Sequence, residues 1–115
     1  MIERTILKYL NEHSDIPFYM EEPRQRPKRY YLMEKTGASQ NDRLFTAMLT
    51  IQSYGTTMED AAELNDAAIG LMLNANVLPE VTRVRLNSDY NYTDTDTDRY
   101  RYQAVFNLTF YRTDY

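Results

Sequence analysis

The sequence predicts an α+β domain: an antiparallel sheet of four to five strands with two helices packed on one of its faces. Segments of alternating apolar and polar residues follow one another directly, instead of alternating with helical segments. Only two segments show helical periodicity, and the predicted element order is α-β-β-β-α-β-β. At 115 residues the chain is the size of one ordinary domain, so we expect a single domain over residues 1–115.

The first predicted element is a helix over residues 2–13. Isoleucine and leucine recur there every four residues, and lysine, glutamate and asparagine occupy the other side. Pro17 ends this helix, because a proline biases the residue before it away from the helical region. Residues 16–20 form a short apolar run that predicts a first strand. Residues 21–29 contain two prolines, which lack the ladder donor that a central strand needs.

The next two segments predict a pair of strands. Residues 29–36 are rich in β-prone side chains, and residues 37–41 are expected to form the turn. Residues 43–54 alternate strictly, which predicts a long strand with one buried face and a partly covered second face. The buried face is expected to carry Phe45, Ala47, Leu49 and Ile51.

A second helix is predicted to begin directly after Gly55. Thr56, followed three residues later by Glu59, fits a capping box, and the acidic residues there favour the positive helix N-terminus. The end is expected near Asn74 to Asn76, because Pro79 follows shortly after. The expected apolar stripe comprises Ala61, Leu64, Ala68, Leu71 and Met72, widened by Ile69.

Two final strands are predicted to form a long hairpin around a polar tip, residues 90–98. In residues 81–90, one side is expected to carry Val84, Leu86 and Tyr90. Residues 99–112 alternate most cleanly of all. Their inward side is expected to comprise Tyr100, Tyr102, Ala104, Phe106, Leu108 and Phe110.

Composition excludes several classes of function. Eleven tyrosines without tryptophan suit half-buried sheet faces and protein–protein surfaces. The absence of cysteine excludes a disulfide framework and a thiolate nucleophile, and a net charge of −4 disfavours general nucleic-acid affinity. No apolar run approaches the ~20 residues of a membrane span, and the first residues lack signal-peptide features. We expect a soluble protein made in the cytoplasm, without a membrane partner.

The chain carries no constellation typical of an enzyme. Its only histidine, His13, lies where the first helix frays. The three glycines, at positions 37, 55 and 70, do not have the spacing of a phosphate-binding loop, and no nucleophile-elbow pattern occurs. We therefore expect a protein that is not an enzyme and that has no catalytic residues, cofactor or metal site.

Two charged segments are candidate contact sites. Asp94, Asp96 and Asp98 have the alternate spacing with which calcium loops begin, yet no glycine or closing glutamate follows at the required positions. A solvated hairpin tip is the favoured interpretation; adventitious calcium or a contact with a basic partner stays open.

The second charged segment is basic and contains Arg24, Arg26, Lys28 and Arg29. It predicts either an electrostatic contact with an acidic neighbour or a loop whose charges keep a sheet edge soluble. Because the two segments are oppositely charged, they predict a head-to-tail contact between subunits, which closes into a ring when repeated.

Two stretches, YYLMEKTG at 30–37 and TIQSYGTTMEDAAELNDAAIGLM at 50–72, resemble the tail terminator or tail-completion family of long-tailed phages. The resemblance covers nearly the whole chain, and Glu34, Lys35, Gln52 and Tyr54 are its markers. It implies a homohexameric ring in the virion, at the head–tail interface. Such a ring binds the tail tube protein and the head-completion or connector protein, with DNA only as cargo passing through it.

Other functions remain open at this point. Another neck component, such as a head-completion or stopper protein, has similar size and symmetry. A nucleic-acid-binding module would use the basic segment with Tyr30, Tyr31, Tyr100 and Tyr102 as stacking surfaces. A small-molecule enzyme is the third alternative.

Overall fold

The computed structural model describes residues 1–112, and within them it confirms the α+β class. The elements are α1 (Ile2–Glu12), β1 (Phe18–Tyr19), β2 (Tyr30–Asn41), β3 (Leu44–Tyr54), α2 (Met58–Leu73), the 3-10 helix η1 (Ala75–Val77), β4 (Val81–Asn91) and β5 (Arg101–Tyr111). This is the predicted order with one short 3-10 helix added. No helix in the described residues is both long and apolar enough to cross a membrane.

The strands form one sheet in the order β1-β2-β3-β5-β4. The expectation of a purely antiparallel sheet is wrong, because β1 pairs with β2 in parallel. The loop between these two strands returns the chain to the end of the sheet at which β1 begins, so both strands run in the same direction. The Tyr31 amide also donates a hydrogen bond to the Pro17 carbonyl, at 2.9 Å. All other strand pairs are antiparallel, so the sheet is mixed.

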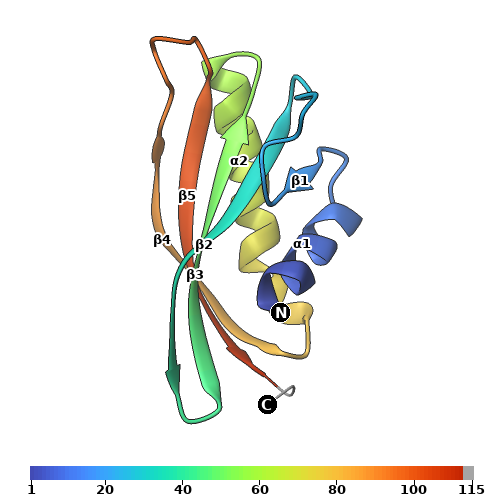
Figure 1. The fold of residues 1–115 in the computed structure, drawn as a ribbon, viewed down its shortest axis with the longest axis vertical. Helices are drawn as coiled ribbons and strands as arrows, with labels where there is room; N and C mark the ends of the chain where they lie inside the picture. The colour runs from blue at the N-terminus through green and yellow to red at the C-terminus, as the bar shows by residue number, and fades with distance from the viewer. Residues whose placement is uncertain (113–115) are drawn as a thin grey trace.

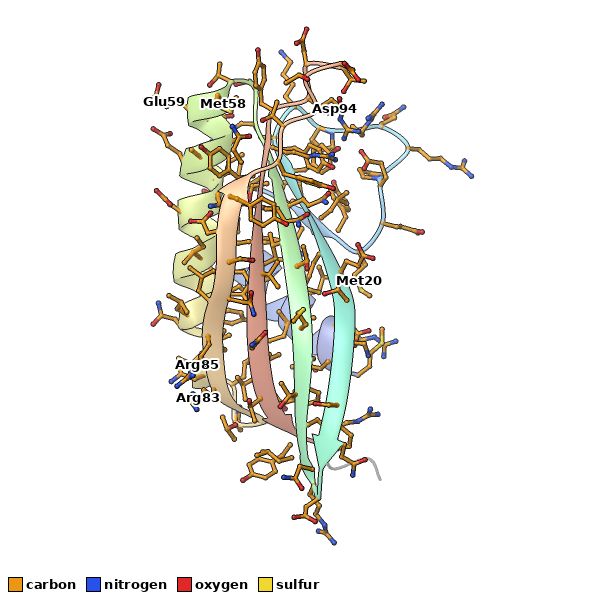
Figure 2. The ribbon with its side chains drawn as sticks, turned by 90° about the vertical axis from the view of Figure 1, so that its left-hand side faces the viewer. Met20, Met58, Glu59, Arg83, Arg85 and Asp94 are labelled. Atoms are coloured by element: carbon orange, nitrogen blue, oxygen red, sulfur yellow. The ribbon has the colours of Figure 1, made fainter. Side chains whose placement is uncertain are left out.

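Both helices cover the same face of the sheet, as predicted (Figure 1). One hydrophobic cluster joins α1, α2 and the inward side chains of β2, β3 and β5. The inward residues of β3 and β5 are Ala47, Leu49, Ile51, Ala104, Phe106, Leu108 and Phe110. The opposite face, called the outer face below, is turned toward the viewer in Figure 2, and no helix lies in front of it.

The turn after β2 lies further along the chain than the sequence predicts. Residues 37–41 belong to the strand, and the turn consists of Asp42 and Arg43, with Asp42 at φ 58°. The ladder with β3 continues to Asn41 opposite Leu44, interrupted only by a bulge between Lys35 and Gly37. Aspartate tolerates this left-handed conformation, so the tight turn needs no glycine.

Helix α2 begins one residue later than predicted. The Thr57 hydroxyl accepts a hydrogen bond from the Asp60 amide at 3.0 Å, and the Asp60 carboxylate accepts one from the Thr56 amide at 2.9 Å. The cap therefore joins Asp60 with both Thr57 and Thr56, and Glu59 is exposed. The amide of Thr56 is the main reason why the pKa of Asp60 lies below its ordinary value.

In strand β4, the residues that point to the core change from even-numbered to odd-numbered positions partway along the strand. Val84 and Leu86 lie opposite the inward residues Leu108 and Phe106, whereas Tyr90 lies opposite Gln103 on the outer face. A bulge between Leu86 and Ser88 adds one residue and so exchanges the two faces. The prediction that Tyr90 shares a face with Val84 and Leu86 is therefore wrong.

Two tyrosine hydroxyls fix helix α2 to the rest of the fold. Tyr31 is buried, stacks on Phe18 at 4.0 Å between ring centroids, and donates to the Leu64 carbonyl at 2.8 Å. Tyr9 donates to the Leu71 carbonyl, also at 2.8 Å. Burial raises the pKa of Tyr31 to about 12 and raises that of Tyr9 as well.

These tyrosines predict alkaline unfolding. Their pKa is higher in the folded chain than the ordinary value of 10.0, so their contribution to stability is complete below pH 10 and is lost as the pH rises toward 12. The free energy of unfolding, measured by urea titration from pH 8 to 12, should fall mainly above pH 10. Tyr31→Phe should show a shallower fall, and an unchanged slope would contradict this explanation.

Candidate assembly surface

The two charged segments singled out in the sequence lie side by side in one chain. Both line an open hollow of about 520 Å³ at one end of the sheet. Arg26 and Lys28 contribute from the basic loop, and Asp98 and Arg99 contribute from the β4–β5 tip. Figure 2 shows this tip, with Asp94 labelled, at the same end as the start of α2. The predicted contact of these segments between subunits stays a prediction.

Half of the basic loop already has acidic partners in its own chain. Arg26 forms an ion pair with Glu22 at 3.6 Å, and Arg29 forms one with Asp60 at 3.0 Å. The two basic residues of the loop that form no ion pair within residues 1–112 are Arg24 and Lys28. The loop therefore offers an external partner two positive charges instead of four.

The acidic tip is a closed turn. Asp94 pairs with Arg99 through an isolated β-bridge, and the Asp94 carboxylate accepts the Asp96 amide at 3.0 Å. A hydrogen bond from the Thr97 hydroxyl is the first cause that lowers the pKa of Asp94. Asp98 adopts a left-handed conformation at φ 52°. Within residues 1–112, no three acidic or histidine side chains are close enough together to hold a metal ion.

A compact side-chain cluster links the basic loop to the tip. The Arg99 guanidinium donates to the Glu22 carboxylate at 2.9 Å and lies 4.5 Å from the ring centroid of Tyr54. The Tyr54 ring stacks on Tyr30, with centroids 4.6 Å apart, and the Tyr30 hydroxyl donates to the same Glu22 carboxylate. Burial, followed by this hydrogen bond, raises the pKa of Tyr30 well above its ordinary value. We call Glu22, Tyr30, Tyr54 and Arg99 the clasp.

The clasp continues onto the outer face as a row of hydrogen bonds. Gln52 donates to Gln103 at 2.9 Å and accepts from the Tyr54 hydroxyl at 2.9 Å, and Gln103 donates to Tyr90. Arg101 donates to the Tyr54 hydroxyl at 3.1 Å. These hydrogen bonds connect side chains of β3, β4 and β5 across the outer face next to the clasp.

The clasp and this row were not predicted as a site. The signal that could have found part of them is the period-2 pattern of β3 and β5. It places Gln52, Tyr54, Arg101 and Gln103 together on the face opposite the core. Two of the four resemblance markers, Gln52 and Tyr54, thus belong to one hydrogen-bond network. Of the other two, Lys35 forms an ion pair with Glu3 at 3.5 Å, and Glu34 is exposed.

Two of the four tyrosines proposed for a nucleic-acid module, Tyr30 and Tyr31, are not available as stacking surfaces. Tyr30 is 3% exposed and Tyr31 is 1% exposed, and the rings of Tyr54 and Phe18 already stack on them. Tyr100 and Tyr102 are partly buried. Base stacking needs an open aromatic face, so these residues do not favour that function.

Comparison with known proteins adds no family assignment: no protein-family model and no curated protein matches this chain.

Proposed function

We propose that this chain is a structural virion protein, one subunit of a ring of the tail terminator type. In this proposal six copies close a ring on the head-proximal end of a phage tail tube. The ring stops further addition of tube subunits and offers the surface to which the filled head binds. The resemblance of residues 30–37 and 50–72 to that family supplies the stoichiometry and the role.

The observation that carries the proposal is a long stretch of ordered strand that contains no buried residue. Every residue from 34 to 44 is exposed, although this stretch is hydrogen-bonded as the end of β2, a turn and the start of β3. Fixing a residue costs about 1–2 kcal/mol of conformational entropy, which burial usually offsets. A contact with another subunit would provide that burial.

The outer face of the sheet supports the same function. Helices cover only one face, and the outer face presents tyrosine, methionine and leucine side chains between threonine, glutamine and arginine. Tyrosine, methionine and arginine are enriched in protein–protein contacts. A subunit of this kind acts by shape and position, so its function requires surfaces and not a reactive group.

Binding preference tests the proposal against a second neck function. The purified chain is mixed either with assembled tail tubes or with tailless heads, and bound protein is measured after sedimentation. A terminator should sediment with the tubes and, in gold-labelled electron micrographs, lie at one tube end. Binding only to the tailless heads would contradict the terminator role and favour a head-completion or stopper protein.

A further inference from the structure

A groove runs along the helical side of the molecule, between the end of α1 and α2. Its volume is about 590 Å³. One wall comes from the segment after α1, including Asp15 and Ile16, and the other from α2, including Glu63 and Ala67. Asp15 and Glu63 are exposed and form no ion pair within residues 1–112. The groove therefore combines a partly apolar surface with two free carboxylates, and the one arginine in its lining, Arg29, is already paired with Asp60.

Gly70 lies on the α2 wall of this groove, and its own chain gives no reason for a glycine there. A Cβ built at Gly70 would meet nothing within 4 Å. Glycine inside a helix costs about 1 kcal/mol relative to alanine. The missing side chain instead leaves room for another chain to approach the backbone of α2.

The β2–β3 hairpin is the element that fits such a groove. Its tip is the turn Asp42–Arg43, followed by Leu44, which is 37% exposed. Figure 1 shows the hairpin projecting beyond both helices at the end of the molecule opposite the β4–β5 tip. Arg43 is exposed and forms no ion pair within the described residues.

We propose that the β2–β3 hairpin tip of one copy occupies the α1–α2 groove of the next copy. Arg43 would lie near Glu63 and Asp15, and Leu44 would contact the apolar groove wall around Gly70. The two surfaces belong to different parts of the chain, so the contact is heterologous and closes into a ring when repeated with rotation. This inference rests on the proposed ring and names its subunit contact.

Disulfide cross-linking tests the contact directly, because the chain contains no cysteine. A disulfide forms only where the Cα atoms approach to within about 7 Å. The full chain carrying both Leu44→Cys and Gly70→Cys is oxidised and run on a non-reducing gel. We expect a ladder of covalent species from dimer to hexamer. Each single variant should give dimers at most.

The control pair is Arg85→Cys with Gly70→Cys, since Arg85 is also exposed but lies on β4. A ladder from the control pair, or a double variant that gives only the dimers of the single variants, would overturn the proposed contact. If wild-type protein still caps tubes in that case, the proposed function stands and only the contact is wrong. If the ladder forms but tubes are not capped, the contact stands and the terminator role fails.

A charge exchange provides a second readout that needs no oxidation. Arg43→Glu should weaken each contact about threefold, the size expected for an exposed ion pair, and so lower the fraction of chain in rings at a fixed concentration. Adding Glu63→Lys to Arg43→Glu should restore that fraction. Equal ring fractions in native mass spectra of wild type and Arg43→Glu would count against the contact.

Discussion

Replacing Phe106 with alanine is expected to lower the free energy of unfolding by about 4 kcal/mol, because a large side chain is removed from a filled core. Phe106 is 0% exposed and lies at the middle of β5, with Leu49 and Leu86 as its neighbours across the two adjacent strands. A domain of this size has a total stability of about 5–15 kcal/mol, so the loss is a large part of the whole. Urea unfolding followed by circular dichroism measures it.

The next residue along β5 provides the matched control. Val105 points to the outer face and is only partly buried, so Val105→Ala should cost no more than about 1 kcal/mol. The loss of stability differs between the two variants because the helices cover the face that carries Phe106 and not the face that carries Val105. Equal losses for both would contradict the two-layer arrangement.

Gly55→Ala is expected to cost about 3 kcal/mol, because the added methyl group has no space. Its Cβ would lie 2.4 Å from the Ala61 nitrogen and 2.8 Å from the Ala61 Cα. Both are backbone atoms in the first turn of α2, so the clash is relieved only by moving the helix relative to β3. For a domain of this length we expect a fall in Tm on the order of 10 °C.

Gly70→Ala separates this close contact from the general effect of replacing a glycine. The new methyl group meets nothing within 4 Å, and alanine is the better helix former by up to about 1 kcal/mol. Thermal unfolding should therefore give a lower Tm for Gly55→Ala and a slightly higher one for Gly70→Ala. A wild-type Tm for Gly55→Ala would show that α2 does not approach β3 as closely as described.

The elements whose side chains alternate or repeat without interruption were predictable from the sequence. In β5, the predicted inward residues from Ala104 to Phe110 are buried, because this face packs against the helical layer. The other two predicted inward residues differ: Tyr102 is only partly buried, and Tyr100 lies before the strand. Helix α2 also buries most of its predicted stripe, together with Asn65, which donates to Asp89 at 2.6 Å. A buried asparagine was not predicted, since its partner lies on a strand distant in sequence.

The features that escaped prediction depend on backbone pairing. The bulge in β4 moves Tyr90 to the outer face without any change in the alternating sequence. The parallel pairing of β1 depends on where the loop of residues 20–29 returns, and no side-chain pattern encodes that path. Strand β2 extends to Asn41 because β3 offers ladder partners that far, although none of residues 37–41 is buried.

The candidate site was predictable only in part. Both charged loops are visible as runs of like charge, but the clasp brings Glu22 together with Arg99 across 77 positions of the chain. That contact neutralises charge within one subunit, which the sequence alone did not indicate. The ring and its role at the tail end remain predictions that rest on the resemblance and on exposed ordered strand.

The length of tails made without this protein tests the proposed role most directly. In the proposed role the gene belongs to a long-tailed phage. The experiment deletes it from that phage and measures tail lengths and head attachment in electron micrographs, with wild-type protein supplied from a plasmid as the control. A ring that ends tube growth predicts overlong tails without heads, restored to normal length by the plasmid. Tails of normal length that join heads in the deletion strain would contradict the account.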